Sequence, residues 1–106
     1  MAPTFGSPIL FPPNVRNYEL YGRYYYMLPS FNGRANENPL EFIRNFYYAL
    51  EYFPLQGLTK EQLKMRCFPY TLNEGARAWW ATLPVASMTT WSEVYDEFMD
   101  KYHYQG

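Results

Sequence analysis

The sequence predicts an all-α fold, a compact bundle of four main helices preceded by an extended aromatic N-terminal arm. Two observations support this class. Apolar residues recur at intervals of three and four from residue 40 onwards, which is the spacing of one face of an α-helix. Prolines and capping sequences divide these stretches into short segments. The expected helices span about residues 39–53, 60–68, 73–83 and 91–103.

The N-terminal part of the chain has no helical period. Residues 1–16 contain four prolines among small side chains, and we expect them to form a flexible Pro-rich tail. Residues 17–28 are dominated by aromatic side chains with high β propensity but no clean alternation, which fits either a short strand or a packed coil. The folded domain is therefore expected to cover residues 17–106.

The first two expected helices have clear start signals. Asn38 can cap the first helix, and Pro39 fits its first position. Thr59 and Gln62 have the spacing of a capping box for the second helix, and Pro69 ends or kinks it.

The last two expected helices carry the tryptophans. Pro84 ends the third helix, and Thr90 with Glu93 forms a capping box for the fourth. Trp79 lies on the apolar stripe of its helix, so Trp80 is expected to be less uniformly buried. The apolar faces of the four helices define the expected core: Leu40, Ile43, Phe46, Leu50, Leu63, Phe68, Leu72, Ala76, Trp79, Leu83, Trp91, Val94 and Phe98.

Length and charge narrow the functional classes. A chain of 106 residues is expected to be one domain. The net charge is −1 with scattered Lys and Arg, which argues against an electrostatic nucleic-acid surface. The sequence shows neither a signal-peptide pattern nor an apolar run of about 18 residues, so we expect no membrane contact and a cytoplasmic location.

No catalytic or metal-binding constellation is recognisable. Cys67 and His103 are the single cysteine and histidine, which are too few for a zinc site or a disulfide. Cys67 is expected to be a small buried hydrophobe. The acidic run from Glu93 to Asp100 fits a solvated helix face better than an acid/base pair. We therefore expect that the chain is not an enzyme and that it binds neither a cofactor nor a metal ion.

The aromatic arm is the candidate binding region. Tyrosines beside Arg23 can stack on single-stranded nucleic acid, but no further basic residues surround them, which favours packing of the arm or contact with a protein partner. The candidate partner-binding residues are Tyr24, Tyr25, Tyr26 and Phe31.

An ordered set of residues resembles a known family. Asn17-Tyr18-Glu19-Leu20 and Leu28-Pro29 lead into Phe31-Asn32-Gly33 and Glu37-Asn38-Pro39, and the later elements follow in the same order: Leu63, Arg66, Phe68-Pro69, Leu72, Ala76, Trp79, Leu83-Pro84, Thr90-Trp91, Phe98 and Lys101-Tyr102. This order, over residues 17 to 103, is similar to the N-terminal Gag capsid domain of plant gypsy-type LTR retrotransposons. Tyr21-Gly22 stands where family members commonly carry a basic-Pro pair.

The resemblance implies a structural domain whose partners are other Gag copies. In the family, the contacts of the shell are divided between this domain and a second capsid domain, so the chain alone is expected to be a monomer or weak oligomer that forms no particles. An alternative is a domesticated, stand-alone module that binds host peptides or interferes with Gag assembly. Some capsid-like domains of similar origin bind extended peptides in an apolar groove, and by analogy the tyrosine arm is expected to border such a groove.

Overall fold

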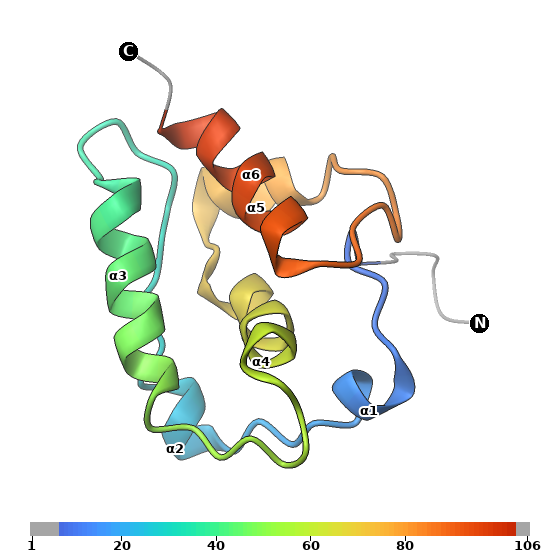
Figure 1. The fold of residues 1–106 in the computed structure, drawn as a ribbon. Coiled ribbons are helices and arrows are strands. Elements are labelled where there is room, and N and C mark those ends of the chain that lie inside the picture. The colour runs from blue at the N-terminus through green and yellow to red at the C-terminus, as the bar shows by residue number, and fades with distance from the viewer. Residues whose placement is uncertain (1–6, 104–106) are drawn as a thin grey trace.

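The structure, a computed structural model, describes residues 7–103 and is mostly helical (Figure 1). Short helices open the chain, longer ones follow, and the described residues contain no named strand. The elements are α1 (Pro13–Arg16), α2 (Gly22–Tyr25), α3 (Pro39–Leu50), α4 (Lys60–Cys67), the 3₁₀ helix η1 (Phe68–Thr71), α5 (Glu74–Trp80) and α6 (Trp91–Tyr102).

The predicted helix starts are confirmed. The Asn38 side chain accepts from two backbone N–H groups of the first turn of α3. Thr59 with Gln62, and Thr90 with Glu93, form complete capping boxes at the starts of α4 and α6. These reciprocal bonds pair backbone N–H groups that a helix start otherwise leaves without partners.

Two predicted helix ends were placed too far along the chain. Helix α3 stops at Leu50, because the N–H groups of residues 51–53 bond to carbonyls three residues back and tighten the chain into a turn. Helix α5 stops at Trp80 for the same reason, since Thr82 and Leu83 donate to Trp79 and Trp80. Tightened last turns of this kind are common at helix ends.

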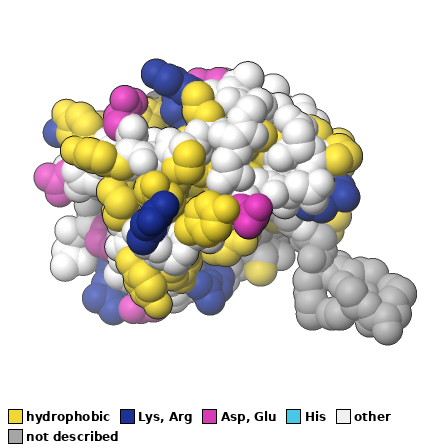
Figure 2. All heavy atoms as spheres, turned by 90° about the horizontal axis from the view of Figure 1, so that it is seen from below, with side chains coloured by type: hydrophobic (Ala, Val, Ile, Leu, Met, Phe, Trp, Pro, Cys, Tyr) yellow, Lys and Arg dark blue, Asp and Glu magenta, His cyan; other side chains and the backbone are white. Residues whose placement is uncertain are grey.

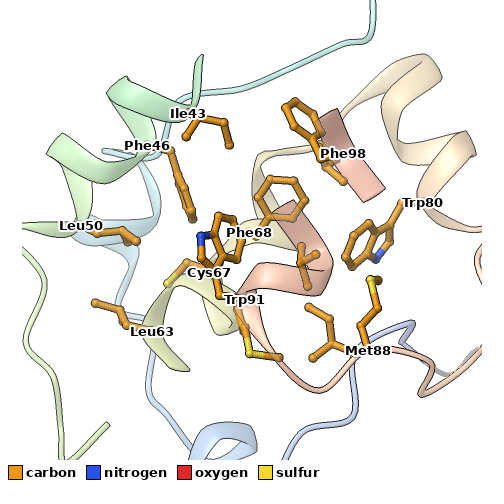
Figure 3. Packing of buried hydrophobic residues seen from close by; sticks show 14 of the residues in the cluster. Ile43, Phe46, Leu50, Leu63, Cys67, Phe68, Trp80, Met88, Trp91 and Phe98 are labelled. Carbon is orange, nitrogen blue, oxygen red and sulfur yellow. The ribbon is translucent and has the colours of Figure 1, made fainter. Parts of the chain in front are cut away.

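Phe68 is the centre of the core. It is fully buried, and its ring lies 5.4–5.8 Å, between centroids, from the rings of Phe46, Trp80, Trp91 and Phe98 (Figure 3). These four rings come from α3, α5 and α6, while Phe68 itself begins η1. One side chain, directly after α4, therefore contacts α3, α5 and α6, and all four ring contacts have the edge-to-face geometry that aromatic pairs prefer.

One predicted core residue, Leu40, is exposed, and two others, Trp79 and Leu83, are only partly buried against the core. Leu40 is 43 % exposed, and Phe42, four residues before Phe46, takes its place in the core. Helix α5 begins only at Glu74, so Ala76 and Trp80 form its buried stripe, while Trp79 and Leu83 are half-buried. Trp80 is 9 % exposed and is the deeper of the two tryptophans. The other predicted core residues are buried: Ile43, Phe46, Leu50, Leu63, Phe68, Leu72, Ala76, Trp91, Val94 and Phe98.

The prediction of a flexible tail was wrong for residues 7–16, and residues 1–6 lie outside the described part of the chain. Residues 7–18, which we call the strap, run along one side of the longer helices and then beneath them (Figure 1). Ile9, Val15 and Tyr18 are buried, so the strap contributes to the core. The sequence pattern did not predict this burial, because a proline-rich, largely extended segment that buries only a few widely spaced side chains shows no helical period.

Candidate functional site

The structure separates the four residues predicted to bind a partner. Phe31 is 1 % exposed and lies in the core against Phe42, Phe98 and Tyr102, so its assignment as a binding residue was wrong. Tyr24 is half-buried, with its ring centroid 5.1 Å from that of Phe53. Tyr25 and Tyr26 are exposed. Within the arm, residues 22–25 form the short helix α2, and the residues on either side of it are coil and turn, with no strand among residues 17–28.

Tyr25, Tyr26 and Tyr70 form an exposed row of rings that we call the tyrosine cluster. The ring centroids of Tyr26 and Tyr25 are 5.4 Å apart, and those of Tyr25 and Tyr70 are 6.0 Å apart, both edge-to-face. Tyr26 is 84 % exposed. Figure 2 views the underside of the molecule, where hydrophobic side chains gather with single Lys or Arg side chains among them. Tyr70 belongs to η1, and no sequence pattern predicted its contact with the arm.

A hydrogen-bonded strand contact holds the strap against the segment before α6. Ile9 and Met88 form a parallel β-bridge, in which Leu10 donates to the Met88 carbonyl at 2.9 Å and Met88 donates to the Pro8 carbonyl at 3.0 Å. Ala86 donates to the Ser7 carbonyl at 2.9 Å. The strap is therefore fixed at this end by its backbone and by the buried Ile9 side chain.

Tyr18 fixes the other end of the strap. Its hydroxyl donates to the Pro54 carbonyl at 2.7 Å, and burial raises the pKa of this hydroxyl to about 12. Next to it, the Gln56 side chain accepts from the Glu19 N–H and donates to the Glu19 carbonyl, both at 2.9 Å. These bonds join the strap to the loop between α3 and α4.

A groove of about 400 Å³ lies between the strap, η1 and the segment that follows α5. We call it the strap groove. Its volume falls in the range of about 300–1,000 Å³ typical of ligand-binding clefts. Apolar side chains dominate its walls, one arginine is present, and no acidic residue contributes: Ser7, Pro8, Phe11, Arg66, Pro69, Tyr70, Trp80, Ala81, Leu83 and Val85.

Arg66 connects the strap groove to the tyrosine cluster. Its Nη1 donates to the Tyr70 hydroxyl and its Nη2 donates to the Tyr18 carbonyl, each at 3.1 Å. The guanidinium carbon lies 5.4 Å from the centroid of the Tyr70 ring, within cation–π range. Within residues 7–103 no carboxylate forms an ion pair with Arg66. Three contacts thus orient a positive charge at an apolar groove.

A second groove, of about 370 Å³, separates the end of α3 from the start of α4. Leu50, Phe53 and Leu63 form its buried floor, and Lys60 and Lys64 line it together with Glu51. The Lys64 ammonium already pairs with Glu61 at 3.1 Å and lies 4.5 Å from the Tyr47 ring centroid. This groove therefore carries charges of both signs, unlike the strap groove.

The remaining chemistry of the described chain is that of a packed core. Burial raises the pKa of Cys67 to about 12, which keeps the thiol protonated and a poor nucleophile near neutral pH. Residues 7–103 bring together no cluster of His, Cys, Asp and Glu side chains able to hold a metal ion. Among the same residues, no helix has the length and hydropathy needed to span a bilayer.

Comparison with known proteins identified no relative: no family model matches the chain, and neither a curated protein nor a solved structure matches it.

Proposed function

We propose that this chain is a structural, protein-interaction domain of a retrotransposon Gag-like protein, and that it contributes capsid-type self-association. The observation that carries this proposal is the tyrosine cluster, three adjacent exposed rings on the surface of a helical domain. Tyrosine supplies a large contact area at low cost in side-chain entropy, and it is enriched in protein interfaces. The sequence resemblance to Gag capsid domains supports the same role.

Sedimentation of the 106-residue chain tests the proposal. We expect weak, concentration-dependent association without closed particles, and weaker association when Tyr25, Tyr26 and Tyr70 are all changed to Ser. Tyr48 on α3 and Tyr52 in the turn that follows it are also exposed, so the Tyr48→Ser/Tyr52→Ser variant is the matched control. Equal association of both variants and the parent chain would show that the tyrosine cluster is not the interface.

The strap groove favours a second function, the binding of an extended partner peptide. An apolar cleft lined on one side by an extended segment accommodates a second extended segment through side-chain burial. In this role the domain is a stand-alone binding module, and self-association is not needed. Isotope-labelled protein titrated with peptides distinguishes the roles. Peptide binding is expected to shift the amide resonances of Ala81, Leu83 and Val85, which line only the groove, whereas self-association is expected to shift those of Tyr25 and Tyr26, which lie outside it.

A further inference from the structure

We propose that the strap groove selects peptide segments that carry a carboxylate among apolar side chains, and that Arg66 is the residue that pairs with this carboxylate. The inference rests on the proposed peptide-binding role of the groove and adds the chemistry of the partner. It follows from three properties of Arg66: its position in the wall of the groove, its fixed orientation and the absence of an acidic neighbour in that wall.

The orientation of Arg66 is set before any ligand binds. One N–H donates to the Tyr18 carbonyl and another to the Tyr70 hydroxyl, and the Tyr70 ring lies against the guanidinium group. An arginine has five N–H donors in a rigid plane, so two contacts leave donors for a ligand. A preoriented side chain loses little entropy on binding, which favours a directed ion pair.

The charge of the groove favours an anionic partner. Arg66 is half-buried among apolar walls, and no lining residue is acidic. The ion pairs within residues 7–103 join Arg34 to Glu74 and Lys64 to Glu61, and neither includes Arg66. A partly desolvated guanidinium binds a carboxylate through short, charge-assisted hydrogen bonds. A ligand with a carboxylate at this point therefore gains more than a neutral one of equal size.

The lining favours a peptide over a nucleic acid. A nucleic-acid strand needs several cations along its phosphates, and Arg66 is the single cation that lines the groove. The other walls are apolar, with Trp80 and Leu83 on one side and Pro8 and Phe11 on the other. Aliphatic and proline side chains of an extended peptide fit such walls, and one acidic side chain satisfies the arginine.

Three peptide pools test the inference. The probes are acetylated, amidated heptapeptides whose central residue is Glu, Gln or Lys and whose other positions are drawn from Leu, Val, Pro and Ser. Each is titrated into the isotope-labelled chain. We expect the Glu pool to bind about tenfold more tightly than the Gln pool, and the Lys pool to bind most weakly, with amide shifts at Ala81, Leu83 and Val85.

Variants of the chain make the test specific. In Arg66→Gln we expect equal affinity for the Glu and Gln pools, whereas Arg66→Lys retains part of the preference. Val85 is 60 % exposed at the groove, and Val85→Glu should weaken binding of the Glu pool by placing a competing carboxylate there. Leu40→Glu is the matched control, because Leu40 is similarly exposed outside the groove. If Arg66→Gln does not fold, binding of the three pools to the parent chain and to the Val85→Glu and Leu40→Glu variants still tests whether the groove selects a carboxylate.

The outcomes separate the inference from the role on which it rests. Equal affinity of the parent chain for the Glu and Gln pools overturns the selection of a carboxylate while leaving peptide binding in place. Absence of shifts with all three pools overturns both. Shifts of groove residues that depend on protein concentration alone would assign the groove to a second copy of the chain. Tighter binding of a single-stranded RNA than of the Glu pool would assign it to nucleic acid, and either result overturns the inference.

Discussion

Two parallel β-bridges tie the N-terminal part of this chain to its C-terminal half, and their surroundings differ. In the first, Phe31 pairs with Leu72, and Phe31 is enclosed by the rings of Phe42, Phe98 and Tyr102. In the second, Ile9 pairs with Met88, but Leu10 and Val85 beside it are more than half exposed. Backbone hydrogen bonds of similar length support both bridges. What differs is the apolar burial around them.

The turn after Phe31 is also more strongly fixed than the strap. The Glu37 carboxylate accepts from the Asn32 N–H at 3.0 Å and from the Arg34 N–H at 2.7 Å. Arg34 in turn forms an ion pair with Glu74 at 2.7 Å, which joins the turn to the start of α5. From this comparison we expect the Ile9–Met88 bridge to open more readily than the Phe31–Leu72 bridge, although the backbone pairing is similar in both.

The largest expected loss of stability follows from truncating one residue in each bridge, Phe31 or Ile9. Phe31→Ala should reduce the free energy of unfolding by about 3–5 kcal/mol, because it leaves a cavity among three rings. Ile9→Ala should cost about 2–3 kcal/mol, since the strap can shift towards the groove and fill part of the space. Urea denaturation measures both, with exposed Leu40→Ala as a near-neutral control. A larger loss for Ile9→Ala would reverse the ranking of the bridges.

The second effect concerns the turn at Gly33. Its φ is +83°, and an added Cβ would meet the Ala76 nitrogen and the Tyr102 hydroxyl at 3.0 Å. Gly57 has a similar φ of +88° but open space around it. Gly57→Ala should therefore cost about 1–2 kcal/mol from backbone conformation alone, and Gly33→Ala at least about 1 kcal/mol more. Equal melting temperatures of the two variants would show that the backbone around Gly33 shifts to accommodate the added Cβ at little cost.

A smaller effect is expected at Glu37, and it depends on pH. Burial acts to raise the pKa of this carboxyl, but the N–H groups of Asn32, Arg34 and Gly33 outweigh it, so the pKa is lowered. A carboxyl with a lowered pKa stabilises the fold at pH values above its unfolded pKa of about 4.3. This stabilisation is lost as pH falls through the folded pKa. Glu37→Gln should cost about 1–2 kcal/mol at pH 7 and much less at pH 3. A pH-independent difference would exclude the charge as its cause.

The smallest effect tests how tightly the strap is held at Tyr18. Tyr18→Phe removes the hydrogen bond to the Pro54 carbonyl and should cost about 0.5–1.5 kcal/mol. The pKa of about 12 lies above that of an unfolded tyrosine, so this contribution is complete below about pH 10 and declines as pH rises towards 12. Hydrogen exchange should show faster opening at Leu10 and Met88 in the variant, with Phe31 and Asn73 unchanged. Equal acceleration at both bridges would mean that they open together.

Local signals predicted the parts of the fold that local chemistry determines. Helix starts followed from Asn38, Thr59 and Thr90, whose side chains bond within their own first turn. The buried faces of α3 and α5 were predicted except at their edges, because Leu40 or Phe42, and Trp79 or Trp80, fit a helical stripe almost equally well. Packing against Phe68 decides between them. Periodicity alone does not contain that contact.

The candidate site was the least predictable part. Sequence reasoning found the exposed Tyr25 and Tyr26 but included Phe31, which the first bridge buries. The strap groove joins side chains from the strap, η1 and the segment after α5, and Arg66 reaches it from α4. Pairings between segments so distant in sequence leave no spacing pattern to recognise.

The two bridges also fix the order in which the chain can be completed during synthesis. They are nested, since the segment between Phe31 and Leu72 lies inside the segment between Ile9 and Met88. The strap leaves the ribosome before the segment around Met88, and both partners of the inner bridge emerge between them. Until the segment around Met88 has emerged, Ile9, which is buried in the finished fold, lacks the partner of its bridge. We expect the inner joint to form first and the outer one to close late, since long-range contacts are the slowest to form.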